Sequence, residues 1–217
     1  MISLRFLFED ETAMRLAKNL IKNNFEWKDL DSGEHAEKKD IIKNVLSKHA
    51  SVDDLRQLRG VGYGMTSNPL TIAQYEPDKR TMSFDSTIQK NKVGAIAAHE
   101  LSHHLDRKDL AKEIATYKPG KVSMTKLMSD YYKSPSEFVA RGGAGHVRNQ
   151  EADYQYWPEG QPTLKKHVSD LRKISSRLSP GQRMVAHHNE PDEERNAFHL
   201  RRLTDDDHDE IIKGRRK

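Results

Sequence analysis

The decade AAHELSHHLD, residues 97–106, contains the pattern H-E-x-x-H and constrains this chain more than any other segment. Apolar residues recur at helical spacing from about residue 92 to 115, which predicts one helix across the motif. Positions i and i+4 of a helix lie one above the other about 6 Å apart, so His99 and His103 can present both imidazoles to one metal ion. Glu100 lies next to the first histidine, where its carboxylate can reach a metal-bound water without binding the metal. That arrangement is typical of a general base beside a Lewis acid.

A third metal ligand is needed, since catalytic zinc usually takes three protein ligands and a water. The chain has no cysteine, which excludes disulfides, thiolate zinc sites and thiol catalysis and leaves histidine or a carboxylate. Glu113 lies ten residues beyond His103 on the same predicted helix, about 15 Å along the axis, and is too far away. Asp109 is the rival ligand, but a helix that continues past the motif points it away from the ion. Glu137 in SPSEFVAR, near the start of another predicted helix, is the strongest candidate.

Several further side chains near the motif and near the candidate third ligand have predicted roles. Asp106 can orient a ligand imidazole without binding the metal itself, although a solvated surface position suits it nearly as well. His104 points about 100° away from its neighbour and is expected to pack rather than bind metal. A hydrogen-bond donor for an oxyanion is also needed, and the candidates are Tyr132, His146 and Tyr131, in that order.

The rest of the chain is expected to alternate helices with a few strands. Alternating apolar residues predict a strand over residues 2–8, followed by a helix with Asp10 as its N-cap. LTIAQY and RTMSFD, joined by EPDK, are typical of a β-hairpin. RGVGYGM, residues 59–65, is expected to be a turn or a strand edge, because it lacks the Lys-Ser/Thr ending of a phosphate loop. The remaining helices are expected at 34–49, after Ser51, from about Ser136 to Ala140 before the glycines, and at 163–178.

Composition predicts two parts of the chain and argues against nucleic acid and membrane as partners. PEGQP, after residue 157, predicts a boundary between a domain of residues 1–158 and a helical, charged extension of residues 159–217. Thirty-seven basic and 33 acidic residues give a net charge of only +4, which argues against nucleic-acid binding. No stretch has the length of a membrane span and the N-terminus does not read as a signal peptide, so we expect a cytoplasmic location.

The stretch AQYEPDKRTMSFDSTIQKNKVGAIAAHELSHHLD, followed by YYKSPSEFVAR, resembles the zincin metallopeptidases of the gluzincin type. It looks most like the large polyvalent protein-associated zincin domains of bacteriophages and mobile elements, over roughly residues 70–145. The resemblance implies an α+β, zincin-like fold, mostly helical, with a small and mainly antiparallel sheet packed on the active-site helix. It also implies that His99, His103 and Glu137 bind zinc and that Glu100 activates water. The chain departs from the pattern at RGGAGH, where a longer helix is usual, and at His104.

These features predict a zinc metallopeptidase that hydrolyses a protein or peptide. Glu100 takes the proton of the water and passes it to the leaving amine, and the strand at residues 80–85 lines a cleft where substrate adds as an extended edge strand. The alternative is a non-catalytic binding or virion-associated protein that keeps a zincin fold and docks a virion or host partner through its C-terminal region. Two histidines, a glutamate and a water suit zinc best, although they do not separate it from manganese or iron.

Overall fold

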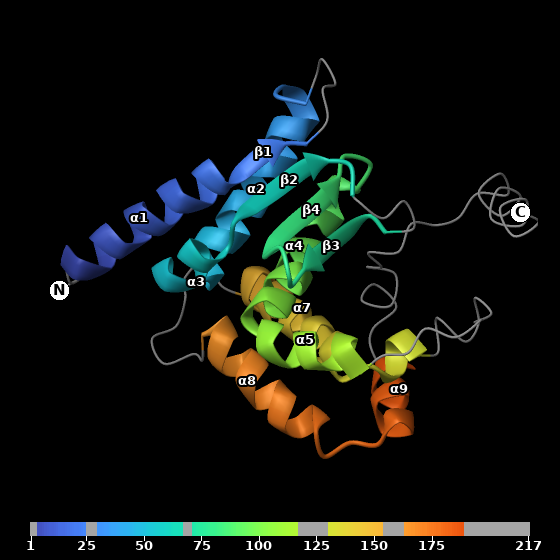
Figure 1. Ribbon diagram of the computed structural model, residues 1–217. Helices are drawn as coiled ribbons and strands as arrows, with labels where there is room; N and C mark the ends of the chain where they lie inside the picture. Colours follow the sequence, from blue (N-terminus) through green and yellow to red (C-terminus); the bar gives the residue numbers. More distant parts are fainter. Residues whose placement is uncertain (1–3, 25–29, 67–70, 117–129, 154–162, 189–217) are drawn as a thin grey trace, which may run out of the picture.

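A computed structural model of the chain describes residues 4–24, 30–66, 71–116, 130–153 and 163–188 (Figure 1). Its architecture is α+β, as predicted, with a four-stranded sheet and helices on one side of it. The strands are β1 (Ile21–Asn23), β2 (Gly60–Gly64), β3 (Ala73–Glu76) and β4 (Thr81–Asp85). The helices are α1 (Leu4–Leu20), α2 (Gly33–His49), α3 (Val52–Gln57), α4 (Lys90–Leu105), α5 (Arg107–Thr116), α7 (Pro135–Asp153), α8 (Leu164–Ser175) and α9 (Pro180–His188).

The sheet has the strand order β1-β2-β4-β3, and it is mostly parallel. β1 pairs with β2 and β2 with β4 in parallel, whereas the predicted hairpin, which is confirmed, makes β3 antiparallel to β4. The expectation of a mainly antiparallel sheet is therefore wrong, because helices α2 and α3 form the crossover from β1 to β2. Residues 59–65 were also predicted incorrectly, since β2 is an interior strand rather than a turn or an edge.

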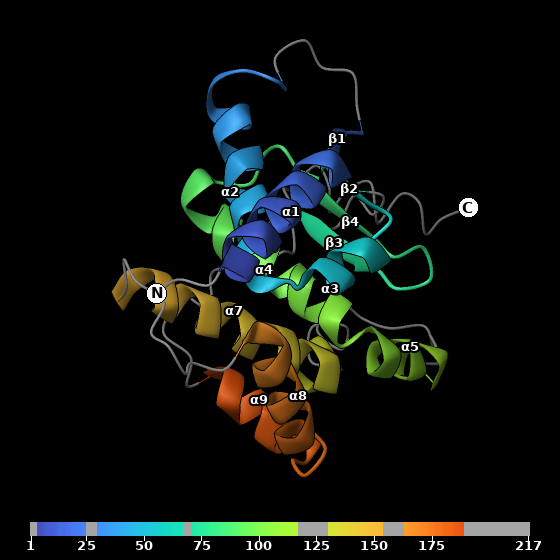
Figure 2. The ribbon, with the colours of Figure 1, turned by 90° about the vertical axis from the view of Figure 1, so that its left-hand side faces the viewer.

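Helices cover one face of this sheet. Alternate residues of β2 and β4 are buried, namely Val61 and Tyr63, and Met82 and Phe84. Figures 1 and 2 show α2 and α4 against the same face. The Tyr63 hydroxyl makes a hydrogen bond of 2.9 Å to His35 of α2, so the side chain of Tyr63 points to the face that α2 covers. The period-two alternation of burial thus identifies which face of the sheet belongs to the core.

The N-terminal segment is a helix, not the strand predicted at residues 2–8. α1 runs from Leu4 to Leu20, so Asp10 lies inside the helix and does not cap it. The apolar residues at positions 2, 4, 6 and 8 alternate as in a strand, but those at positions 4, 7 and 8 have the spacing of one helical face. Neither glycine nor proline interrupts the segment, and the pattern continues into Ala13 and Ala17, which are buried against α2 and the core.

The helix that carries H-E-x-x-H ends earlier than predicted. Instead of one helix across residues 92–115, α4 stops at Leu105 and α5 begins at Arg107. The residue between them, Asp106, has φ −94° and ψ 6°, and its N–H donates to the Ser102 carbonyl at 2.9 Å. The helix therefore breaks three residues after the second histidine of the motif.

Glycines do not interrupt the helix that carries Glu137, contrary to the expectation that it would end near Ala140. α7 continues to Asp153, and its glycines permit close packing instead. A Cβ built on Gly142 would lie 2.6 Å from Leu171 Cδ1 of α8, and one on Gly143 would lie 2.1 Å from Ser102 Oγ of α4. The missing side chains allow α7 to pack tightly between α4 and α8.

The predicted helix at residues 163–178 is confirmed as α8. The Thr163 hydroxyl accepts the Lys166 N–H at 3.3 Å and caps the N-terminus of the helix. Leu164 and Val168 are buried in the hydrophobic core shared with α4 and α7. α9 was not predicted from the sequence.

The boundary at residue 158 and the charged segment 189–217 lie outside the described residues. None of the described helices is long and apolar enough to cross a membrane.

Candidate metal site

Helices α4 and α7 bring the three predicted metal ligands together. His99 Nε2 lies 3.1 Å from His103 Nε2 and 3.3 Å from Glu137 Oε2, and His103 Nε2 lies 3.4 Å from Glu137 Oε1. An ion with tetrahedral geometry and bonds of about 2.0–2.1 Å separates its ligand atoms by about 3.3–3.4 Å. Among the described residues these three form the group that could hold a metal ion. Two imidazoles and one carboxylate are a donor set that suits zinc.

The two histidines of the site and Glu100 are buried, and their hydrogen bonds are incomplete. His99 and His103 are each 6% exposed, and Glu100 is 1% exposed. His103 Nδ1 and Glu100 Oε1 have no hydrogen-bond partner among the described residues. The two Nε2 atoms face each other, so this contact is a hydrogen bond only when one of them carries a proton and the other does not. A cation bonded to both lone pairs would satisfy the pair without that condition, so the residues fit a metal.

Electrostatics at the site favour an ionised Glu137. Burial opposes its charge, but the nearby His103 and hydrogen bonds from both histidines outweigh burial and hold its pKa well below the ordinary range. For His103 burial favours the neutral form, yet Glu137 and other carboxylates raise its pKa to about 8. Burial lowers the pKa of His99. These shifts favour an ionised Glu137 carboxylate next to a protonated His103.

Glu100 lies beside the triad without joining it. Burial raises its pKa to about 8, and the backbone N–H of Tyr75 hydrogen-bonds its carboxylate. Tyr75 belongs to β3, so this contact joins the base to the sheet. Glu100 is therefore a neighbour of the three candidate ligands and is not one of them.

The rejected ligands have other partners. Asp109 forms an ion pair of 2.9 Å with Lys112 on the surface of α5, so it does not face the triad even though the helix breaks. Glu113 accepts hydrogen bonds from Ser134 and Ser136 at the start of α7. The predicted alternatives to Glu137 are thus engaged elsewhere.

Asp106 and His104 stabilise the surroundings of the site. The carboxylate of Asp106 is buried and pairs with Arg172 of α8, whereas the sequence suggested that it orients a ligand imidazole or lies solvated at the surface. His104 is fully buried and packs as predicted. Its Nδ1 lies 3.1 Å from the Tyr75 hydroxyl, and its Nε2 lies 2.9 Å from the Asp54 carbonyl. His104 therefore joins α4 to both β3 and α3.

The structure reorders the candidates for an oxyanion donor. Tyr131, the last of the three in the sequence-based order, has its hydroxyl hydrogen-bonded to Glu137. Tyr132 instead lies under Arg141, whose guanidinium carbon is 5.6 Å from the ring centroid. His146 stacks on His167 of α8 with ring centroids 4.1 Å apart. It is nine residues beyond Glu137, about 13.5 Å along α7. Of the three candidates, Tyr131 has a hydrogen bond to a candidate ligand, and His146 is displaced from the triad along α7.

The edge strand beside the site is β3, not the strand predicted to line a cleft. Residues 80–85 include β4, which lies between β2 and β3 and has no open edge. The N–H of Tyr75 points away from β4, because it bonds Glu100. In an antiparallel pair the N–H and C=O of one residue point the same way, so the Tyr75 carbonyl also points off the edge. Sequence reasoning missed this role of Tyr75, and the only signal was a tyrosine in the hairpin that precedes the motif.

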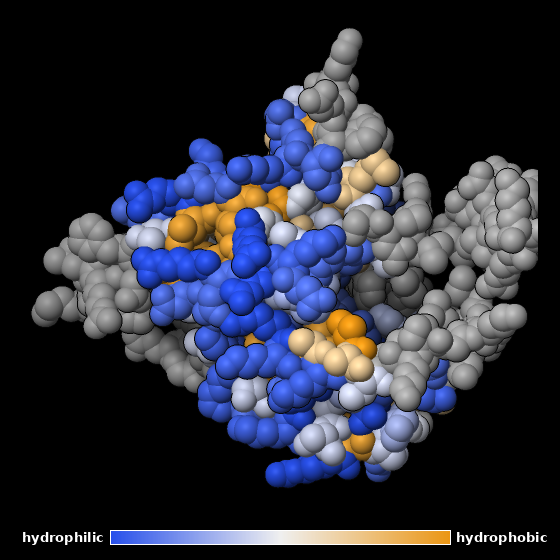
Figure 3. Space-filling model, viewed as in Figure 1, coloured by the Kyte–Doolittle hydropathy of each residue, from blue (hydrophilic) through white to orange (hydrophobic). Residues whose placement is uncertain are grey.

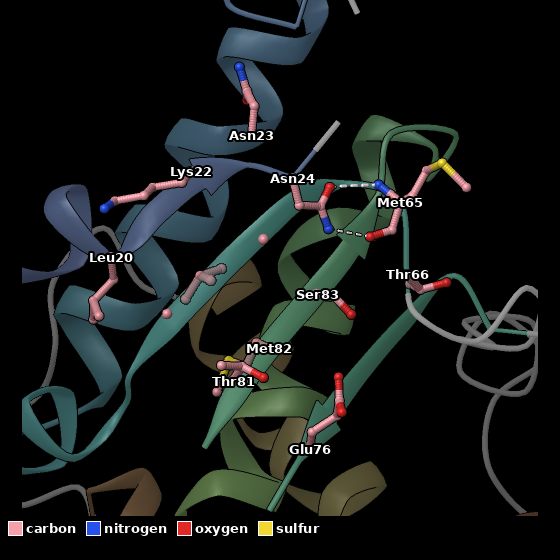
Figure 4. A pocket seen from close by; sticks show the side chains of 13 residues that line it. Leu20, Lys22, Asn23, Asn24, Met65, Thr66, Glu76, Thr81, Met82 and Ser83 are labelled. Atoms are coloured by element: carbon pink, nitrogen blue, oxygen red, sulfur yellow. Dashed lines mark hydrogen bonds between the residues drawn. The ribbon is translucent and has the colours of Figure 1, made fainter. Parts of the chain in front are cut away.

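A hollow lies on the face of the sheet that the helices leave open, away from the triad (Figure 4). It has a volume of about 430 Å³, and its floor includes Gly60, Gly62, Thr81 and Ser83. Its lining includes none of the candidate ligands or Glu100. Hydrophilic residues cover most of the described surface seen in Figure 3. The exposed large hydrophobic residues lie in separate elements or loops, namely Met14, Met65, Ile114 and Ile174.

Comparison of the chain with models of protein families, with curated proteins and with solved structures gives no match. The candidate site is therefore supported by its own geometry and chemistry.

Proposed function

We propose that the chain is a zinc-dependent metallopeptidase. The observation that carries the proposal is the triangle of His99, His103 and Glu137, whose edges of 3.1–3.4 Å suit one tetrahedral ion, with Glu100 buried next to it. Three protein ligands from one helix pair leave a fourth position for water or substrate, which distinguishes catalytic from structural zinc sites.

Each residue of the site has a chemical task in this proposal. A bound zinc ion would supply a Lewis acid that polarises the scissile carbonyl, and a positive charge that favours the ionised form of Glu100. The Glu100 carboxylate removes a proton from the attacking water and delivers it to the departing amine nitrogen. The Tyr131 hydroxyl, held beside Glu137, donates a hydrogen bond to the carbonyl oxygen as negative charge develops there.

The substrate backbone would bind along β3. This strand is at the edge of the sheet, and Tyr75 directs its N–H towards Glu100. Main-chain hydrogen bonds would position the backbone of an extended peptide that adds to this edge, and its carbonyl groups would then lie near Glu100. The proposal thus assigns the binding role to β3 instead of β4.

Glu100→Gln separates catalysis from metal binding. The variant should retain about one zinc per chain and lose hydrolysis of a peptide library, monitored by mass spectrometry, because the amide is isosteric but cannot accept the proton. Glu34→Gln, on the exposed surface of α2, is the matched control and should cleave like the wild type. Cleavage by Glu100→Gln at the wild-type rate would refute the mechanism.

His99→Ala tests the ligand set itself. Elemental mass spectrometry should show that the bound zinc is lost in this variant and kept in His167→Ala, a control on α8. A wild-type chain that binds zinc but cleaves nothing in the library would favour the non-catalytic binding protein. A wild-type chain that binds no metal would refute both the site and the peptidase.

A further inference from the structure

The position of Glu137 depends on how α7 begins, because the other two candidate ligands lie on α4. The Glu137 N–H donates to the Ser134 hydroxyl at 3.1 Å, and that hydroxyl donates to Glu113 Oε1 at 2.6 Å. Ser136 donates to Glu113 Oε2 from its N–H at 3.1 Å and from its hydroxyl at 2.7 Å. The first turn of α7 is therefore anchored to α5 on both sides of Pro135.

Arg172 of α8 connects this turn to the end of α4. Its Nε donates to Asp106 Oδ1 at 3.0 Å, and its Nη2 donates to Asp106 Oδ2 and, at 2.7 Å, to the Ser136 hydroxyl. Its Nη1 is 3.8 Å from Glu113 Oε2. The side chains of Arg172 and Asp106 are 18% and 5% exposed, so water competes weakly for these bonds. One guanidinium thus contacts α4, α5 and α7.

The partners of Arg172 are adjacent to the ligands. Asp106 follows His103 by three residues at the point where α4 ends, and Ser136 immediately precedes Glu137. A planar guanidinium with two parallel bonds to a carboxylate has a defined orientation, which a single flexible cation does not provide. The guanidinium therefore constrains the distance between the histidine pair and the carboxylate.

We propose that Arg172 is a positioning residue that sets the distance between the histidine pair and Glu137, and thereby the affinity and coordination geometry of the metal. This inference rests on the metal site of the proposed function. It makes α8, which lies outside the segment that carries the motifs, part of the machinery of the site. Replacement of residues that orient metal ligands typically weakens metal binding by about 10- to 100-fold.

α8 has other contacts that keep it docked when Arg172 is changed. Leu164 and Val168 are buried in the core, and Lys165 Nζ lies 2.7 Å from Asp54 Oδ1. Loss of the guanidinium therefore removes the bridge between Asp106 and Ser136 but leaves α8 docked and α4 packed on α7.

The experiment compares Co²⁺ and Zn²⁺ binding by the full-length chain and its variants. Arg172→Met should weaken binding of both ions by about 10- to 100-fold, measured by chelator competition, and should change the visible absorption of bound Co²⁺. Arg172→Lys should recover part of the affinity, because it restores the charge without the planar pair of donors. Lys173→Met, which replaces an exposed neighbour paired with Asp170, is the matched control and should behave like the wild type.

Ser136→Ala provides a second variant in case Arg172→Met does not fold. It removes the bonds of the Ser136 hydroxyl to the guanidinium and to Glu113 and leaves the pair between Arg172 and Asp106 intact, so it should also weaken metal binding and alter the Co²⁺ spectrum. Thermal unfolding in chelator reports folding separately. Folded variants at both positions with wild-type affinity and spectrum would overturn the inference while leaving the peptidase intact. A wild-type chain that binds neither ion would overturn the proposed function, and this inference with it.

Discussion

Gly143→Ala is expected to destabilise the protein, because α7 passes α4 at this residue without room for a side chain. A Cβ at position 143 would lie 2.1 Å from Ser102 Oγ and 2.9 Å from Ser102 Cβ. Ser102 is fully buried, and its hydroxyl already donates to the Ala98 carbonyl at 2.7 Å. Rotation of the hydroxyl relieves the first contact only, since the backbone fixes the position of Ser102 Cβ. The two helices must therefore move apart.

The expected loss is the difference between two opposing effects. Inserting one methyl group into a packed interface typically costs about 1–3 kcal/mol, and the upper part of that range applies where two backbone-mounted atoms meet. Alanine in place of glycine inside a helix returns up to about 1 kcal/mol. We therefore expect the free energy of unfolding of Gly143→Ala to fall by about 1–2 kcal/mol.

Urea denaturation followed by circular dichroism measures this loss, and two further variants establish its cause. Gly181→Ala in α9 is the control, because a Cβ there meets nothing within 4 Å, and it should be neutral or slightly stabilising. In a Ser102→Gly background the obstruction is absent, so Gly143→Ala should no longer destabilise. An equal loss in both backgrounds, or a gain in the wild-type background, would refute the packing argument.

Two other predictions concern stability. Burial lowers the pKa of His49 in the folded chain to about 4, from 6.5. The unfolded chain binds the extra proton as pH falls below 6.5, so this residue should lower the free energy of unfolding by about 2 kcal/mol at about pH 5 relative to neutral pH. His49→Gln should lose that part of the pH dependence in urea titrations, and an unchanged dependence would contradict the assignment. On the open face of the sheet, Gly60→Thr should stabilise the interior strand by up to about 1 kcal/mol, because a Cβ there meets nothing within 4 Å. Gly62→Thr should destabilise, because a Cβ would lie 2.7 Å from the Asn24 amide that binds the Met65 backbone; equal melting temperatures for the two variants would count against this difference.

Local sequence was sufficient for the parts of the site that follow from helical geometry. His99, Glu100 and His103 lie on one helix at spacing that places the histidines one above the other, so their relation depended only on the helix forming. Ser51 also caps α3 as predicted, with its hydroxyl accepting the Asp54 N–H at 3.2 Å. Glu137 was selected by elimination, and the fold brought it within 3.4 Å of both histidines.

Short-range patterns failed where two structures fit the same residues or where a residue acts through a distant partner. The apolar spacing of the N-terminal residues suited both a strand and a helix. The glycines at 142 and 143 signal a helix end when considered alone, but in the fold they face Leu171 and Ser102. A pattern along one segment contains no information about which element packs against it.

By itself, the sequence determined that one helix carries two histidines and a glutamate in the order that metal chemistry requires, because the i and i+4 relation is local. Only the tertiary structure decided that Tyr75 and Tyr131 contact the two glutamates of the site, and that Arg172 contacts Asp106 from 66 residues away. The contacts of Tyr75 and Arg172 join distant segments, so they depend on how helices and strands pack around a common core. The physical cause of that packing is the burial of apolar faces from many segments at once.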